Sequence, residues 1–182
     1  MVNFNSWMTG KNLYQVFIHI AVIVLAAEVF ILATQNDKLK NPVKPETMKK
    51  GEYFSLAELR SLAGKDLGPT SSKLVVFVFN TKCPFCVKSL PYWQKIDSVA
   101  SAMKVNVIGI GLDSVSSVLA YAKEHRFAFQ VFVPTNIVKF KERNKIAGVP
   151  HTVLVSGEGR VESLWSGMID EKSYTEVIRL LL

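Results

Sequence analysis

The two cysteines of the chain, Cys83 and Cys86, stand three positions apart, just after a continuous apolar run. That run, Leu74–Phe79, is rich in β-branched and aromatic residues, as a central strand covered on both faces should be. A helical stretch reaching to about Ala102 follows the cysteines. This order predicts an α/β domain in which both thiols lie at the N-terminus of a helix.

The rest of the chain alternates between strand-like and helix-like segments. Gly157-Glu158-Gly159 is a strong turn signal between two strand-like runs, so the chain should close with an antiparallel hairpin and an amphipathic helix. The pattern predicts a mixed sheet between two helical layers, a three-layer α/β/α arrangement. The expected strands are 105–112, 129–133, 151–156 and 160–165, and the expected helices are 114–125, 136–145 and 170–182.

The segment Leu13–Thr34 is long and apolar enough to cross a membrane, which takes about 20 residues in helical form. A cleavable signal peptide is the alternative, since Lys11 precedes the segment. The run is long for a signal peptide, however, and no pair of small residues marks a cleavage site at its end. We therefore expect an uncleaved, single-pass anchor. His19 and Glu28 lie inside this segment. Either they contact a partner helix, or Glu28 is neutral and His19 lies at the membrane interface.

Length and charge complete the expected organisation. A chain of 182 residues accommodates one domain and an anchor. The net charge of +7 is spread along the chain without an arginine-rich run, which argues against nucleic acid as a partner. Lysines are dense only after the apolar segment, where a membrane-surface role fits them. We expect a tail (1–12), an anchor (13–34), a Lys/Pro-rich tether (35–50) and one globular domain (51–182).

The spacing of the cysteines favours redox chemistry. A disulfide-stapled scaffold needs more cysteines, and a zinc site needs four ligands, whereas the three histidines lie apart from this pair. Pro84 suits the first helical turn, and the free N–H groups there stabilise a thiolate at Cys83. Cys83 would attack a disulfide, and Cys86, one helical turn later, would resolve the mixed disulfide. No cofactor or metal is expected.

A second motif, Val149-Pro150, stands at the entrance to the strand that begins at His151. An X–Pro bond there is either an ordinary trans bond at a strand start or a cis bond. The cysteines lie about 65 residues upstream, and this combination favours the cis form. His151 itself is either a partner of a thiolate or a residue that points into the sheet.

Four segments together resemble the thioredoxin-like family of TlpA and ResA type, over about residues 51–182. They are Phe54-Ser55-Leu56, Cys83-Pro84-Phe85-Cys86, Gly148-Val149-Pro150-His151-Thr152 and Gly157-Glu158-Gly159-Arg160-Val161. The resemblance implies a thioredoxin fold, a cis-proline loop at Pro150 facing the cysteines, and a Val149 backbone that binds substrate beside Pro84 and Phe85. It also implies protein disulfides or dithiols as substrates and a membrane-embedded electron donor. The anchor and the CPxC motif are also similar to accessory proteins of methylamine dehydrogenase assembly.

The chain departs from this family at three places around the cysteines. Lys82 stands where the family usually has Trp, and Phe77 stands where thioredoxin has a buried acid. Without that acid, proton transfer to Cys86 needs another group or water. The Pro84-Phe85 dipeptide also differs, so the sequence leaves open whether the pair reduces or oxidises its substrates.

Orientation in the membrane sets two arguments against each other. The lysines after the span favour a cytoplasmic domain by the positive-inside rule. The family resemblance implies a domain outside the cytoplasm, in a periplasmic or equivalent space, and this is the orientation that we expect.

Two other functions remain as alternatives. A peroxidase of peroxiredoxin type needs Thr three residues before its reactive cysteine and Pro further upstream, where this chain has Asn80 and Val76. A non-catalytic assembly factor would use the thiols to bind a metal or a partner, and would lack exchange activity.

Overall fold

The computed structural model describes residues 10–40, 46–64 and 73–182, and the chain divides into two compact units, Met1–Lys44 and Pro45–Leu182. The first unit contains α1 (Gly10–Lys40). Its stretch Tyr14–Gln35 is long and apolar enough to span a membrane. The helix continues beyond Thr34, so the first residues of the expected tether are helical. Residues 41–45 of that tether and residues 1–9 of the expected tail lie outside the described parts of the chain.

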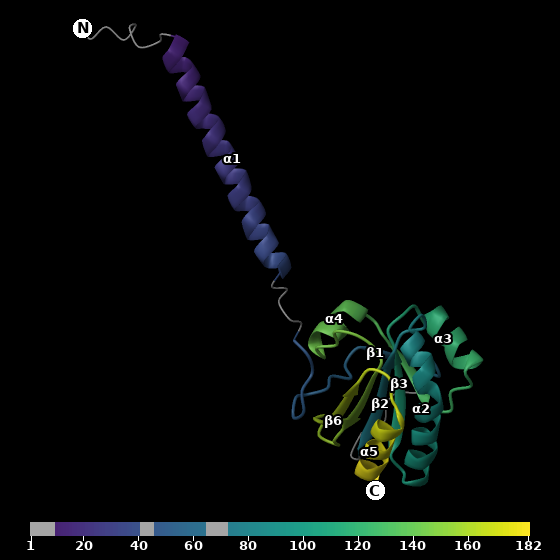
Figure 1. Ribbon diagram of the computed structural model, residues 1–182. Helices are drawn as coiled ribbons and strands as arrows, with labels where there is room; N and C mark the ends of the chain where they lie inside the picture. Colours follow the sequence, from purple (N-terminus) through teal and green to yellow (C-terminus); the bar gives the residue numbers. More distant parts are fainter. Residues whose placement is uncertain (1–9, 41–45, 65–72) are drawn as a thin grey trace. The chain divides into compact units, whose positions relative to one another are not determined.

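The second unit is built on one six-stranded sheet with the strand order β1-β4-β3-β2-β5-β6 (Figure 1). The central strand β2 pairs in parallel with β3 and antiparallel with β5, which makes the sheet mixed, as predicted. The strands are β1 (Leu59–Ser61), β2 (Leu74–Phe79), β3 (Asn106–Gly111), β4 (Gln130–Pro134), β5 (His151–Val155) and β6 (Val161–Ser166).

Helices cover both faces of this sheet. Figure 1 shows α5 beside α2, with both in front of the strands. Side chains of α2, α3 and α5 share one buried cluster, whereas Phe140 of α4 joins the cluster on the other face. This is the expected three-layer thioredoxin fold. The helices are α2 (Pro84–Ala102), α3 (Val115–Glu124), α4 (Ile137–Arg143) and α5 (Glu171–Leu181).

Side chains of β2 alternate between the two clusters because successive residues of a strand point to opposite faces. Val75, Phe77 and Phe79 belong to the cluster under α2, and the residues between them belong to the cluster under α4. All six residues of β2 are buried. The strand is thus fixed from both sides, and the residues that follow it are delivered to one defined edge of the sheet.

Polar caps fix the starts of the other helices. The side chains of Ser114, Asn136 and Asp170 each accept a hydrogen bond from the backbone N–H three residues later. Such caps satisfy donors that the helix leaves free. The N-cap of α3 is Ser114.

The short edge strand β1 was not predicted from the sequence. Leu59–Ser61 pairs antiparallel with Phe132–Pro134 of β4. Its three residues are partly or fully exposed, so no alternation of buried and exposed residues marks it. The pairing depends on β4, which lies about 70 residues away along the chain.

Candidate active site

Cys83 caps the N-terminus of α2. Its backbone is extended (φ −89°, ψ 111°), and Pro84 occupies the first helical turn. The Sγ atom accepts a hydrogen bond from the backbone N–H of Cys86 at 3.2 Å. This contact satisfies one of the free donors of the helix, and the helix dipole favours negative charge at the same place. The geometry therefore offers a hydrogen-bond donor and the positive end of the helix dipole to the sulfur of Cys83.

The two thiols differ in their access to solvent. Cys83 is half-buried, whereas Cys86 is fully buried, and both are free thiols. Burial raises the pKa of Cys86 far above its ordinary value, and its hydrogen bond with Cys83 raises this pKa further. Cys86 is consequently a protonated, shielded thiol, and Cys83 is the one that a large substrate can reach.

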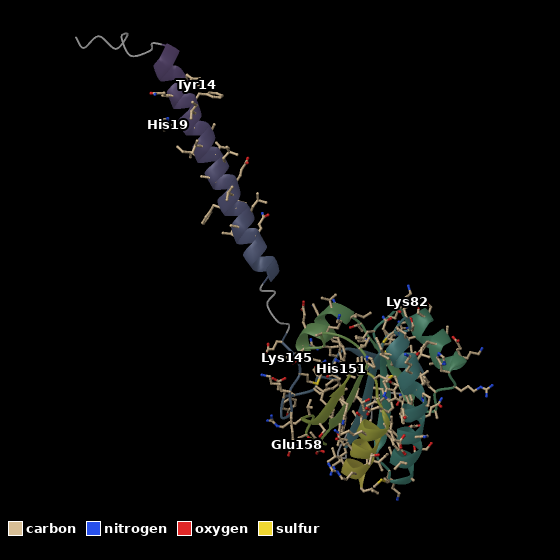
Figure 2. The ribbon with its side chains drawn as sticks, in the orientation of Figure 1. Tyr14, His19, Lys82, Lys145, His151 and Glu158 are labelled. Carbon is tan, nitrogen blue, oxygen red and sulfur yellow. The ribbon has the colours of Figure 1, made fainter. Side chains whose placement is uncertain are left out.

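The loop between β2 and Cys83 is tied to the end of β3. The Asn80 side chain donates to the Leu112 carbonyl at 2.9 Å and accepts from the backbone N–H of Lys82 at 2.9 Å. The Thr81 hydroxyl donates to the Asp113 carboxylate, and this bond lowers the pKa of Asp113. These bonds hold the loop at one position relative to the sheet. Lys82 is exposed and lies at the edge of the domain (Figure 2).

The loop before β5 meets Cys83 directly. The Val149–Pro150 peptide bond is cis. The Cys83 thiol donates to the Val149 carbonyl across 3.7 Å between Sγ and O. Pro150 is buried, and Val149 is half-buried. The backbone of Val149 therefore lies beside the reactive sulfur, where an extended substrate segment could also pair with it.

A third loop, between β6 and α5, completes the site. The backbone N–H of Gly167 donates to the Pro150 carbonyl at 2.8 Å. Ser89, buried in α2, accepts from the backbone N–H of Ile169 at 3.2 Å and donates to the Phe85 carbonyl at 2.9 Å. Met168, between these two anchor points, is 45% exposed.

Apolar side chains are exposed around the accessible thiol. Phe85 is 54% exposed, and the Lys88 ammonium lies 5.7 Å from the centre of its ring. Pro84 is also exposed. Together with Met168 and half-buried Val149, these residues make an apolar rim beside Cys83, and they come from the start of α2 and from the loops before β5 and α5. An apolar rim beside the backbone of a loop is suited to a protein segment rather than to a small polar ligand.

Aromatic packing and one buried hydrogen bond support the site from below. Trp93 of α2 is fully buried and stacks on Phe77, with ring centres 4.9 Å apart. Its indole N–H donates to the Thr152 hydroxyl at 2.9 Å. This bond links the helix that carries the cysteines to the strand that follows Pro150. Phe77, which stands at the sequence position of the buried acid of thioredoxin, is thus packed against Trp93.

His151 lies on the other face of the sheet. Since Thr152 reaches Trp93 of α2, its neighbour His151 points toward α4, on the same side as its cross-strand partner Val78. Figure 2 labels this residue. Neither ring nitrogen has a hydrogen-bond partner among the described residues. Burial lowers the pKa of His151, and the Gly148 backbone offsets part of this effect. His151 is thus a residue of the sheet interior.

The structure brings Cys83, Cys86 and Val149 together, as the sequence predicted, and leaves Pro84 and Phe85 exposed beside them. Sequence reasoning missed Ser89, Met168 and Tyr121, a buried phenol of α3 near the thiols. No local signal could have found them, because each reaches the site through the fold. Within the described ranges, no group of three or more His, Cys, Asp or Glu side chains is arranged to hold a metal ion.

A comparison with known protein families identifies the family of this chain. The profile of the Redoxin family matches residues 34–178, most of the chain. The chain belongs to the Redoxin family. As a Redoxin it is an oxidoreductase, and its fold is the one that the family requires. No curated protein matches the chain significantly in sequence.

Solved structures show the same fold at low sequence identity. The thioredoxin domain of a thiol-disulfide oxidoreductase from Bacteroides vulgatus is 16% identical, with a TM-score of 0.65 over 75% of this chain and 100% of that one. A putative thiol:disulfide interchange protein DsbE from Chlorobium tepidum is 16% identical, with a TM-score of 0.64 over 74% and 99%. StoA from Bacillus subtilis is 17% identical, with a TM-score of 0.55 over 75% and 98%.

Proposed function

We propose that this Redoxin is a membrane-anchored thiol–disulfide oxidoreductase in which Cys83 is the nucleophile and Cys86 the resolving thiol. The observation that carries the proposal is the asymmetry of the pair, an accessible sulfur at a helix N-terminus with a buried sulfur one turn behind it. This arrangement suits attack by the first thiol and displacement by the second.

The proposed reaction has two exchange steps. The Cys83 thiolate attacks one sulfur of a substrate disulfide, forms a mixed disulfide and releases the other substrate sulfur as a thiolate. Cys86 then loses its proton and attacks Cys83. A Cys83–Cys86 disulfide forms, and the second substrate sulfur leaves and takes up a proton. The substrate disulfide gains two electrons, and the Cys83–Cys86 pair loses the same two electrons as it forms its own disulfide.

The surroundings of Cys83 support a protein substrate. An extended segment would pair with the backbone of Val149, next to Pro150, and would place apolar side chains against Pro84, Phe85 and Met168. Pro84, Phe85 and Met168 are exposed, and Val149 is half-buried. The geometry around the site thus favours a disulfide in a protein segment over a small soluble disulfide.

We further propose that the domain works as a reductase outside the cytoplasm and regains electrons from a membrane-embedded donor. The apolar helix α1 supports the anchor, and the structural similarity to proteins such as a thiol:disulfide interchange protein DsbE supports the reaction class. A donor in the membrane would suit a domain that carries its own membrane anchor.

The reaction is tested with the full-length chain in detergent and a protein disulfide such as that of insulin. The wild type should reduce it catalytically when a chemical reductant regenerates the pair. Cys83→Ser should abolish turnover, and Cys86→Ser should accumulate a mixed disulfide on Cys83. Ser98→Ala, an exposed position on the same helix, serves as the control. Peroxide consumption without disulfide reduction would instead establish the peroxidase alternative.

Orientation is tested by labelling intact cells with a membrane-impermeant maleimide. Because the chain has two cysteines and Cys86 is buried, the label reports on Cys83. Labelling of the wild type but not of Cys83→Ser is the expected result. Labelling only after the cells are broken would place the domain in the cytoplasm.

A further inference from the structure

The hydroxyl group of Tyr121 has no role in the fold. Tyr121 lies on α3 and is 6% exposed. Its hydroxyl oxygen is buried without a hydrogen-bond partner among the described residues. Leaving such a group unpaired costs free energy, and buried hydroxyl groups in proteins are almost always bonded.

The ring of Tyr121 explains its burial but not its hydroxyl group. The ring stacks on Phe79 with centres 5.6 Å apart and meets Phe127 edge to face at 5.8 Å. A phenylalanine could make both contacts and would leave no orphaned oxygen. The hydroxyl oxygen of Tyr121 therefore has no hydrogen-bond partner among the described residues of the protein in its reduced form.

The sulfur atoms of the active site belong to the same buried region of the domain as Tyr121. Tyr121 and Cys86 belong to one buried cluster, and Cys83 packs against it. Burial first, and then negative charge on Cys86 and on Cys83, raise the pKa of Tyr121 to about 12. Glu124 on the same helix adds a smaller effect, and the His125 ring lies 4.3 Å from the Tyr121 ring, centre to centre. The phenol thus stays neutral and keeps its capacity to donate a hydrogen bond in the buried region that holds both sulfur atoms.

The proposed reaction needs such a donor. Cys86 must become a thiolate to attack the mixed disulfide, yet its burial opposes ionisation. The position of the buried acid of thioredoxin is taken by Phe77, which is packed against Trp93. Hydrogen bonds of this kind are often absent in a resting structure and form only as the reaction proceeds.

We propose that the Tyr121 hydroxyl donates a hydrogen bond to the Cys86 thiolate during the resolving step, and so takes the place of the missing acid. The inference rests on the proposed function. Cys86 loses its proton to solvent, the Tyr121 O–H stabilises the anion, Cys86 bonds to Cys83, and the substrate thiolate leaves. The phenol keeps its own proton throughout, so atoms and electrons balance as in the two-step exchange.

The test separates the two exchange steps with the aromatic disulfide dithiobis(nitrobenzoate), which releases a coloured thiolate at each step. The full-length reduced chain in detergent is mixed with this probe in a stopped-flow instrument. The first release depends on probe concentration and reports on Cys83. The second does not depend on it and reports on Cys86. The variants are Tyr121→Phe and, as a matched control, Tyr92→Phe, which alters a phenol of α2 that is directed toward Glu171.

Tyr121→Phe should leave the first release unchanged and slow the second about ten-fold or more, as loss of a hydrogen bond to a charged group implies. The pH at which the second rate rises should also move upward, because an anion without its donor forms less readily. Tyr92→Phe should match the wild type in both steps. A second rate within two-fold of the wild type would overturn the inference. A wild type that releases a single thiolate would instead overturn the proposed function.

Discussion

The buried bond between Trp93 and Thr152 gives a quantitative prediction about how the site is held together. The Trp93 N–H donates to the Thr152 hydroxyl at 2.9 Å, and both side chains are fully buried. Thr152→Val keeps the shape of the side chain but removes the acceptor. The indole N–H then has no partner in the core, and such an orphaned donor costs about 1–3 kcal/mol. We expect the free energy of unfolding to fall by about 2 kcal/mol.

A double-mutant cycle isolates this bond from other effects of the substitutions. Trp93→Phe removes the donor and part of the ring, and leaves a cavity whatever stands at position 152. In that background Thr152→Val removes no hydrogen bond, so its cost should fall to about 0.5 kcal/mol or less. Because the bond joins α2 to β5, Thr152→Val should also slow disulfide exchange at Cys83.

Urea denaturation of the four proteins, followed by tryptophan-independent far-UV circular dichroism, measures the cycle. The reasoning is refuted if Thr152→Val costs the same free energy with Trp93 as with Phe at that position. A cost near zero in the wild-type background would refute it equally.

Three further predictions concern other parts of the domain. An alanine at Gly111 would place its Cβ 2.6 Å from both methyl groups of Val118, so Gly111→Ala should cost about 1–3 kcal/mol of stability in urea denaturation, and adding Val118→Ala should restore most of it. The Asn144 side chain accepts from the Ser55 N–H at 2.7 Å and donates to the Ser55 carbonyl at 3.1 Å. Asn144→Ala should therefore lower the free energy of unfolding by about 2–3 kcal/mol. In a hydrogen-exchange experiment, the segment around Ser55 should lose its protection first. Burial lowers the pKa of His151 below its ordinary value near 6.5. Below about pH 6.5 the unfolded chain therefore binds a proton that the folded chain does not bind. The free energy of unfolding consequently falls as the pH drops. His151→Leu should therefore lose less stability than the wild type between pH 7 and 5, and equal losses would contradict this.

The central elements of the fold were predictable because their signals are local. Leu74–Phe79 is a continuous apolar run, and the run is in fact the central strand with all residues buried. The helix start at Cys83 followed from Pro84 and the cysteine spacing. The glycines of Gly157-Glu158-Gly159 marked the hairpin. In each case a few neighbouring residues determine the backbone, so the sequence sufficed.

The parts that the sequence did not reveal depend on contacts between distant segments. β1 exists because β4 offers it a free edge, not because its own residues favour a strand. Met168 approaches the cysteines only because Gly167 bonds to Pro150 and Ile169 to Ser89. No periodicity reports such pairings. α1 continues past the expected anchor to Lys40, because Lys and Asn after the apolar stretch are compatible with both a helix and a tether.

The central claim is that Cys83 is the accessible nucleophile and Cys86 its shielded partner. The most direct measurement is the partition of a limiting amount of iodoacetamide between the two thiols of the reduced full-length chain, read by peptide mass spectrometry. The account predicts that the label enters Cys83 almost exclusively while the chain is folded, and both cysteines equally once it is denatured. Equal labelling in the folded chain, or a preference for Cys86, would contradict it.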